Sequence, residues 1–212
     1  MADSGRIDLE LAERHLRERD KGLARVISSV GRCELESRDR GSVVEYLARS
    51  IVYQQLSGKA AGTIHGRLLD LFDRRRLRSE DLLKLPMPVL RSAGLSQSKA
   101  LALRDLAGRD QKGLLPTRRT LNQMSDAEII ARLSEVRGVG EWTVQMLLIF
   151  YLGRPDVLPV RDLGVLKGYQ KMRGFTELPP PSRLERAGLR WKPHRSVATW
   201  YLWRCLEVDL VE

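Results

Sequence analysis

Apolar residues recur three or four positions apart along most of this chain, which is the spacing of one face of an α-helix. One clear example is the stripe of Val144, Leu147, Leu148 and Tyr151. No segment alternates between apolar and polar residues strongly enough to predict a sheet, and no internal repeat is visible. The pattern therefore predicts an all-α protein built from many short helices.

The stripes and the residues that interrupt them divide the chain into expected elements. Asp20-Lys21-Gly22 breaks the first helical region into two helices. Helices are expected near residues 7–30, 42–53, 60–72, 79–85, 89–93, 96–106, 125–133 and 141–151, from residue 162 onward, and after residue 196. Connectors are expected at residues 31–41, 113–121 and 174–182.

Polar residues mark several of the expected helix ends. Residues 73–76, Asp-Arg-Arg-Arg, are interpreted as the charged end of a helix, because the helix dipole favours cations there. Ser79 is expected to cap the short helix that follows. Ser125, with Glu128 three residues later, predicts a capping box. Asp162 stands just before an apolar helical stretch and is also interpreted as an N-cap.

A Gly-Val-Gly turn at residues 138–140 separates two of the predicted helices. Gly138 and Gly140 let the backbone turn sharply and leave amide N–H groups uncovered by side chains. These amides precede the second helix, where free N–H groups and the helix dipole favour an anion such as a phosphate. An ordinary turn between two packed helices is the alternative, and the glycines alone do not decide between the two.

The charge of the chain narrows the classes of partner. Lys and Arg number 37 against 27 Asp and Glu, which gives a formal charge of +10 over 212 residues and favours nucleic acid. No segment is long and apolar enough to span a bilayer, and the N-terminus lacks the apolar run of a secretory signal. Cys33 and Cys205 are far apart, and the histidines number three, so reduced thiols without a zinc or iron–sulfur site are expected.

Two further polar segments stand at the ends of predicted helices. Gln54 and Gln55 stand beside Leu56 at a helix junction, and without context they are most simply solvated polar surface. Ser96 and Lys99 lie at the start of a predicted helix. They serve either to cap that helix or to contact a nucleic-acid phosphate.

Five motifs together resemble one protein family. They are Ile51-Val52-Tyr53-Gln54-Gln55-Leu56-Ser57, Gly94-Leu95-Ser96 with Lys99, Gly138-Val139-Gly140 with Trp142-Thr143, Leu158-Pro159-Val160-Arg161-Asp162-Leu163-Gly164, and Trp191-Lys192-Pro193-His194-Arg195-Ser196 with Ala198. In this order they cover about residues 8–206, and the chain resembles the helix-hairpin-helix DNA glycosylases, most closely the 3-methyladenine DNA glycosylase II group. A lone hairpin is shared with ligases and polymerases, whereas the hairpin with the downstream aspartate and the terminal motif is specific.

The resemblance implies a helix-hairpin-helix glycosylase fold with two helical lobes around a DNA-binding cleft. The expected organisation is one glycosylase unit over residues 1–212. A central lobe over residues 42–158 contains the helix-hairpin-helix at 126–151, and residues 1–41 with 159–212 form the second lobe. The chain resembles the compact form without the N-terminal β domain that some members carry.

In this family the aspartate that matches Asp162 is the catalytic carboxylate. Breaking an N-glycosidic bond builds positive charge on the sugar, and a fixed carboxylate near C1′ stabilises that charge. Bifunctional members carry a lysine two positions after the second glycine of the hairpin, where this chain has Trp142. The resemblance therefore implies a hydrolase without lyase activity. Arg161, where members often have an acidic residue, acts either on Asp162 or on a phosphate.

The resemblance also implies an aromatic base pocket. Trp142 and Trp203 match pocket aromatics, and cation–π contact suits positively charged bases such as 3-methyladenine and 7-methylguanine. Met146 and Leu163 stand where a family member has tyrosines, so this pocket is less aromatic. N1-methyladenine and N3-methylcytosine are further candidate substrates.

For DNA, the resemblance implies that the target base is flipped out of the stack. The segment of Gln54, Gln55 and Leu56 fills the vacated space, and the sequence does not indicate which residue enters. The segment around Ser96 and Lys99 contacts the opposite strand.

The hairpin residues Gly138, Gly140 and Thr143 are expected to hold a phosphate. The backbone carbonyls of Arg137 and Val139 are expected to bind a structural Na⁺ or K⁺, and no cofactor is required. The implied partner is double-stranded DNA with alkylated bases, bound by a monomer. The implied location is cytoplasmic, at the nucleoid of a bacterium, or nuclear in a eukaryote.

Two alternatives remain open at this point. One is a glycosylase for oxidised or deaminated bases, against which the absent hairpin lysine argues. The other is a non-catalytic helix-hairpin-helix module that only binds DNA. Such a module needs neither Asp162 nor the terminal tryptophans.

Overall fold

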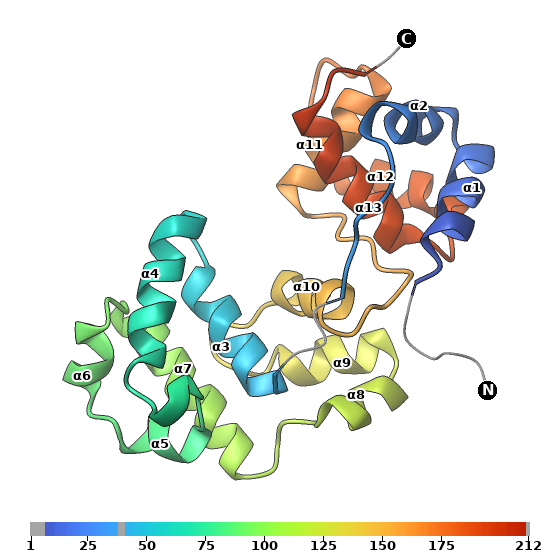
Figure 1. Cartoon of the computed structure of the whole chain (residues 1–212). Coiled ribbons are helices and arrows are strands. Elements are labelled where there is room, and N and C mark those ends of the chain that lie inside the picture. The colour runs from blue at the N-terminus through green and yellow to red at the C-terminus, as the bar shows by residue number, and fades with distance from the viewer. Residues whose placement is uncertain (1–6, 38–40, 211–212) are drawn as a thin grey trace. The chain divides into compact units, whose positions relative to one another are not determined.

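The computed structural model describes residues 7–37 and 41–210, and Figure 1 shows the helices that these residues form. Within those ranges every regular element is an α-helix or a 3₁₀ turn, which confirms the predicted all-α fold. No helix among them is long and apolar enough to cross a bilayer. The elements are α1 (Leu9–Arg19), α2 (Lys21–Val30), α3 (Val43–Tyr53), α4 (Gly58–Leu69), η1 (Asp73–Arg75), α5 (Ser79–Lys84), α6 (Met87–Ser92), α7 (Gln97–Gln111), α8 (Arg118–Gln123), α9 (Asp126–Leu133), α10 (Glu141–Phe150), α11 (Leu163–Arg173), α12 (Pro181–Gly188), η2 (Leu189–Trp191), α13 (Arg195–Arg204) and η3 (Cys205–Glu207).

The chain forms two compact units. One, called the terminal unit below, comprises residues 1–39 and 148–212, and the other, called the central unit, comprises residues 40–147. The second boundary falls inside α10, so residues 148–158, which the resemblance assigned to the central lobe, belong to the terminal unit.

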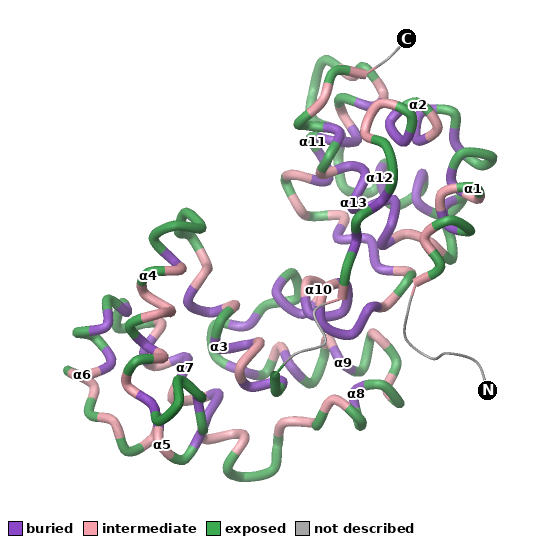
Figure 2. Tube along the Cα trace, in the orientation of Figure 1, coloured by how far each residue is buried: buried purple, intermediate pink, exposed green. Residues whose placement is uncertain are grey.

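Helix α13 is the core of the terminal unit. It packs against α1, α2 and α11, and its residues 196–202 are all buried (Figure 2). Helix α11 lies directly against α13 at Gly168, where a Cβ would lie 1.9 Å from the carbonyl oxygen of Leu202. Only glycine permits this approach, so the two helices meet backbone against backbone.

The predicted break at residues 20–22 contains a buried carboxylate. Asp20 is only 3% exposed, and it caps α2 by accepting the amide N–H of Gly22. Its other oxygen accepts the indole N–H of Trp191 at 2.9 Å and pairs with the guanidinium of Arg173. A buried charge is tolerated when it is paired and hydrogen-bonded. Asp20 therefore joins α2, α11 and the terminal tryptophan motif into one core.

Helix α7 has the same place in the central unit. It packs against α3, α5 and α6, and its N-cap is Ser96, which is one of the two interpretations that the sequence left open. The capping box of Ser125 and Glu128 at the start of α9 is also confirmed. These caps satisfy amide groups that the first turn of a helix leaves without partners.

Two predictions about residues 73–79 are wrong. Helix α4 ends at Leu69, and residues 73–75 form a separate 3₁₀ turn in which Arg74 and Arg75 have positive φ. Ser79 is the first residue of α5 rather than its cap. Its hydroxyl instead donates to Asp110 at 2.6 Å, so it joins α5 to α7.

Two expected connectors contain helices. Residues 118–123 form α8, which Thr117 caps, and residues 181–188 form α12 with Pro181 in its first turn. Both helices are short and lack a long apolar stripe. Periodicity alone therefore did not reveal them.

Candidate active site

Asp162 is the N-cap of α11, as the sequence predicts, and its carboxylate has a partner on a second helix. Its Oδ1 accepts the backbone N–H of Val165 at 2.7 Å and the indole Nε1–H of Trp203 at 3.0 Å. Trp203 belongs to α13, so donors from two helices fix the orientation of one carboxylate oxygen. Asp162 is half-buried, which suits a carboxylate that must be held in place and still face a ligand.

An aromatic pair supports this carboxylate. The indole of Trp203 is stacked on the ring of Phe150, with 5.8 Å between ring centroids and 19° between planes. A Cβ on Gly164 would lie 3.0 Å from Cδ1 of Trp203 and 3.1 Å from Oδ1 of Asp162. Gly164 therefore leaves the space through which the indole reaches the carboxylate.

Phe150 and Gly164 were not among the predicted site residues. Gly164 stands inside the motif that contains Asp162, and that position was the available signal. Phe150 lies in the apolar run of α10, where nothing in the spacing distinguishes it from an ordinary core residue.

The chain that leads to Asp162 is fixed by the terminal motif. Arg195 binds the carboxylate of Asp156 through two bonds of 2.7 and 2.8 Å, which is the bidentate geometry of a strong ion pair. The hydroxyl of Ser196 donates to the carbonyl of Arg154 at 2.6 Å and accepts the amide of Val157 at 3.0 Å. The Arg-Ser pair of this motif thus has a structural role next to the site.

The two neighbours of Asp162 in sequence are open to solvent. Leu163 is 55% exposed, which is unusual for a leucine at the first position of a packed helix, and Arg161 is exposed as well. An apolar side chain and a cation therefore flank the carboxylate on the surface of the terminal unit.

The Gly-Val-Gly hairpin lies in the central unit, between α9 and α10. Gly138 has φ of +77°, a left-handed conformation that glycine adopts without strain, and both glycines are exposed. The intervening Val139 is buried, and its amide donates to the carbonyl of Val136 at 3.0 Å. The turn is anchored by one apolar side chain while both glycines face outward.

A hydrogen bond to a side chain of α7 also holds the hairpin. The amide of Arg137 donates to the carboxylate of Asp105 at 2.8 Å, and Arg109 pairs with the same carboxylate at 3.1 Å. No pattern in the sequence indicated Asp105, because it lies 32 positions before its partner.

Two residues predicted for the base pocket belong to the central unit, and both lie in the first turns of α10. Trp142 is 48% exposed, although tryptophan usually buries most of its surface. Met146 is half-buried, and its carbonyl accepts the hydroxyl of Tyr46 at 3.0 Å. Thr143, between them, is only 4% exposed, so its side chain faces the interior of the unit.

The three residues predicted to fill the vacated stack differ in their surroundings. The side-chain amide of Gln54 donates to the carbonyl of Gly138 at 2.9 Å and to the hydroxyl of Thr143 at 3.3 Å. Gln55 is exposed and has φ of +57°, and Leu56 is 40% exposed. Gln54 is therefore bonded to the hairpin, whereas the next two residues project from the turn after α3.

The side chain of Lys99 is directed at the end of α3. Its ammonium donates to the carbonyls of Val52 and Gln54, both at 2.7 Å, and burial lowers its pKa. Ser96 is exposed, and its hydroxyl accepts the amide of Lys99. The structure thus brings the predicted residues Gln54, Lys99, Gly138 and Thr143 together in one cluster of the central unit.

The predicted site residues divide between the units. Asp162, Leu163, Trp203 and Arg161 belong to the terminal unit, and the others belong to the central unit. The hydrogen bonds described above join residues within each unit.

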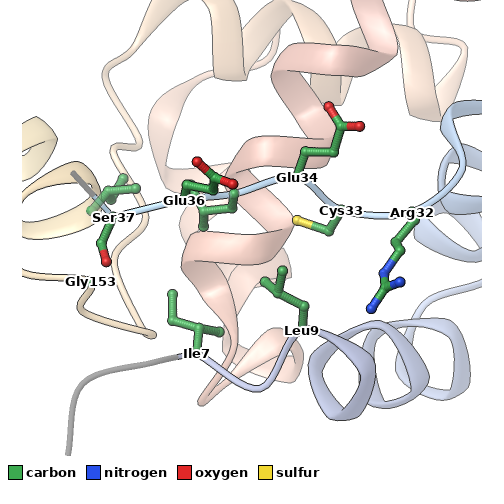
Figure 3. A pocket seen from close by; sticks show the side chains of 10 residues that line it. Ile7, Leu9, Arg32, Cys33, Glu34, Glu36, Ser37 and Gly153 are labelled. Atoms are coloured by element: carbon green, nitrogen blue, oxygen red, sulfur yellow. The ribbon is translucent and has the colours of Figure 1, made fainter. Parts of the chain in front are cut away.

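A pocket of about 670 Å³ in the terminal unit has a different character (Figure 3). Its lining includes Cys33 and the carboxylates of Glu34 and Glu36. Burial raises the pKa of the Cys33 thiol to about 12, so the reactive thiolate is scarce at neutral pH. Glu34 and Glu36 outnumber the cation Arg32, so the lining is net negative and disfavours phosphate, and this pocket therefore fits neither a nucleophilic site nor a DNA site.

Metal chemistry has little support in the described part of the chain. No cluster of three or more His, Cys, Asp or Glu residues is arranged there to bind a metal ion. At the hairpin, the carbonyl of Gly138 already accepts the side-chain amide of Gln54.

Comparison with known proteins gives consistent relatives. The DNA-3-methyladenine glycosylase 1 of Schizosaccharomyces pombe is 32% identical over 198 residues, which cover 92% of this chain and 87% of that protein. A solved structure of the 3-methyladenine DNA glycosylase of this yeast in complex with abasic DNA has a TM-score of 0.82 and covers 92% of this chain and 95% of that chain. A DNA-3-methyladenine glycosidase structure from Bacillus halodurans also has a TM-score of 0.82, with 32% identity, and covers 91% of this chain and 88% of that chain.

The family model agrees with these relatives. The model of the helix-hairpin-helix GPD superfamily of base excision DNA repair proteins matches residues 48–194, which contain the hairpin, Asp162 and the start of the terminal motif. This chain therefore belongs to the helix-hairpin-helix GPD superfamily of base excision DNA repair proteins.

Proposed function

We propose that this protein is a DNA glycosylase that hydrolyses the N-glycosidic bond of alkylated bases in double-stranded DNA. The observation that carries the proposal is the carboxylate of Asp162, held by donors from α11 and α13 in a chain of the base excision repair family. The names of its relatives, which are 3-methyladenine glycosylases, indicate the class of base.

Asp162 is proposed to act on the sugar. As the bond to the base breaks, C1′ and the ring oxygen gain positive charge, and a preorganised carboxylate stabilises that charge without having to reorient. The indole of Trp203 provides part of this preorganisation through its bond to Oδ1. A water molecule then adds to C1′ and loses one proton, so that the products are an abasic site and the neutral methylated base.

Hydrolysis, rather than a lyase reaction, follows from the hairpin. A lyase of this superfamily uses a lysine amine that attacks C1′ and forms a covalent intermediate. Residues 133–147 contain no lysine, and Trp142 stands at the position concerned. We therefore expect a free base and an uncut strand as the products.

The proposed base pocket uses apolar and aromatic side chains that are exposed or half-buried. N3- and N7-alkylated purines carry positive charge, and an indole face attracts such a ring through cation–π contact. Trp142 and Trp203 are the proposed aromatic members, and Met146 and Leu163 are proposed to add apolar contact. Because these bases are already good leaving groups, the pocket needs no base-specific acid.

The proposed DNA contacts lie mainly in the central unit. The exposed amides of Gly138 and Gly140 precede α10, where free N–H groups and the helix dipole favour a phosphate. Gln55 and Leu56 are proposed to fill the stack that the flipped base vacates. Arg161 and Ser96, both exposed, are proposed as further phosphate contacts.

Two minor proposals complete this account. The carbonyls of Arg137 and Val139 would hold a monovalent cation through neutral oxygens, with a structural role only. The protein would act wherever the DNA of the cell lies, at the nucleoid or in the nucleus.

The test is base release from duplexes that each carry one defined lesion. We expect release of 3-methyladenine and 7-methylguanine, strand breaks only after mild alkali, and no adduct trapped by borohydride. Retention of the duplex without release would favour a DNA-binding module. A borohydride-trapped adduct would contradict the hydrolytic mechanism.

A further inference from the structure

We propose that Gln54 and Lys99 are positioning residues that hold the exposed turn of Gln55 and Leu56 at a fixed place relative to the hairpin. The inference rests on the proposed function, because it assigns these residues to base flipping in that reaction. It removes Gln54 and Lys99 from the set of residues that contact DNA directly and gives both a role inside the protein.

The first observation is the side-chain amide of Gln54. Its Nε2 reaches two parts of the helix-hairpin-helix, the carbonyl of Gly138 at 2.9 Å and the hydroxyl of Thr143 at 3.3 Å. Gly138 is in the turn, and Thr143 is in the first turn of α10 and buried. One amide therefore ties the residue after α3 to both the turn and the helix of a motif more than 80 positions away.

The second observation is the ammonium of Lys99. It donates to the carbonyls of Val52 and Gln54, both at 2.7 Å. The last carbonyls of a helix have no partner within it, and a charged donor makes one of the stronger bonds available to them. Lys99 stands in the first turn of α7, so this bond joins the end of α3 to the start of α7.

Gln54 is thus bonded on both sides. Its main-chain oxygen accepts from Lys99, and its side-chain amide donates to the hairpin. We call these four bonds, made by Gln54 and Lys99 to Val52, Gln54, Gly138 and Thr143, the brace. With its amide engaged in the brace, Gln54 is a poor candidate to enter the base stack.

The third observation is the backbone of the next residue. Gln55 has φ of +57°, a left-handed conformation that a residue with a side chain adopts at a cost. Such a conformation persists where the surrounding structure determines it. The brace holds the residue immediately before Gln55 in place, and the exposed Leu56 follows.

The brace has a specific consequence for catalysis. DNA affinity comes from amides and positive charge spread over the surface, and it survives small movements of one turn. Filling a vacated stack needs the inserting side chain at one distance from the bound phosphate, and misplacement by about 1 Å can cost up to 100-fold in rate. Loss of the brace should therefore lower flipping and base release more than binding.

The test compares variants that keep side-chain volume. Gln54→Met and Lys99→Met remove the donors, Lys99→Arg retains them, and Gln111→Met alters an exposed glutamine at the other end of α7 as the matched control. Three quantities are measured: the dissociation constant for a lesion duplex, the single-turnover rate of base release, and the fluorescence of 2-aminopurine beside the lesion, which reports unstacking.

We expect both methionine variants to lower the single-turnover rate about 10- to 100-fold and to reduce the fluorescence change. The dissociation constant should stay within about threefold of the wild type, since the phosphate contacts remain. Lys99→Arg should restore rate and fluorescence, and Gln111→Met should match the wild type. Thermal unfolding of each variant checks that the fold is retained.

Wild-type rate and fluorescence in Gln54→Met would overturn the proposal, as would a loss of affinity that accounts for the whole loss of rate. A lack of rescue by Lys99→Arg would overturn the part assigned to Lys99. If the wild-type protein releases no methylated base, the proposed function fails, while the fluorescence of the bound duplex still tests the brace.

Discussion

The two units hold their functional groups in different ways. In the terminal unit a side chain, the carboxylate of Asp162, is fixed by N–H donors from two helices. In the central unit the proposed functional groups are main-chain amides of the hairpin, and the side chains of Gln54 and Asp105 bond to the backbone around them. On the proposed function, we therefore expect the terminal unit to act on the bond that is cleaved, and the central unit to place the DNA, both at the bound phosphate and at the vacated stack.

The largest effect should come from the contact between α11 and α13 in the terminal unit. In Gly168→Ala the new Cβ meets the Leu202 carbonyl at 1.9 Å, and α11 and α13 must separate. We expect a loss of about 3 kcal/mol or more in the free energy of unfolding, measured by denaturant titration. Gly108→Ala is the matched change in α7 of the central unit, where a Cβ meets nothing within 4 Å, and it should stabilise by about 0.5–1 kcal/mol. Equal stability of the two variants would contradict the observed packing.

Next in size is the effect of the indole on the rate. Trp203→Phe keeps a ring that stacks on Phe150 and removes the donor to Asp162. A hydrogen bond to a charged group contributes about 1.5–3 kcal/mol, so the single-turnover rate should fall about 10- to 100-fold with DNA affinity unchanged. Trp200→Phe, in the same helix, serves as the control.

The choice of lesion sharpens this prediction. If the indole acts through Asp162, the loss should be the same for 3-methyladenine and 7-methylguanine. A loss confined to one base would instead assign Trp203 to base recognition alone.

A smaller effect is expected for a change in the hairpin, and it should lower DNA affinity more than the rate of base release. Gly138→Ala places a side chain at φ of +77° and its Cβ 3.3 Å from that of Ala102. Such strain costs about 1–3 kcal/mol, so the turn should distort and DNA affinity should fall about 5- to 100-fold. At saturating enzyme the rate of base release should change much less. A lower rate with unchanged affinity would contradict the phosphate-binding role that we propose for the hairpin.

Gly140→Ala refines the same test. A Cβ at this position meets nothing within 4 Å, and the variant should fold normally. Any loss of affinity then reports a close approach of DNA to the amide of Gly140.

The smallest expected effect is on the stability of the fold at acid pH. Burial, with His15 adjacent, lowers the pKa of His194 below its ordinary value of 6.5. The unfolded chain therefore binds more protons at this residue, and stability should decline as pH falls below about 6.5 and stay flat above it. His194→Gln should reduce this decline in equilibrium unfolding. His65→Gln is the counterpart in the central unit, where burial likewise lowers the histidine pKa. An unchanged pH dependence in both variants would contradict the assignment.

Much of the fold was predictable because its signals are local. The apolar stripes, the capping box of Ser125 and Glu128, and the caps formed by Ser96 and Asp162 all depend on residues within four positions of one another. The family motifs supplied the candidate site residues, and their roles in catalysis and binding stay predictions.

The remainder of the site depends on contacts that spacing cannot reveal. Trp203 reaches Asp162 across 41 positions, and Gln54 reaches Gly138 across 84. Lys99 illustrates the consequence: its charge suggests a phosphate contact, whereas its ammonium caps the end of α3. Helix α8 escaped prediction because Leu121 is the one apolar residue among its six, so it shows no period.

The central claim is that the carboxylate of Asp162 carries base release and is dispensable for DNA binding. The direct measurement is Asp162→Asn, which keeps a side-chain oxygen to cap α11 and removes the charge, assayed on one 7-methylguanine duplex for affinity and for single-turnover release. The account predicts affinity within about twofold of the wild type and a rate at least about 1,000-fold lower, because a preorganised charge at the sugar is lost. Release at the wild-type rate would contradict it.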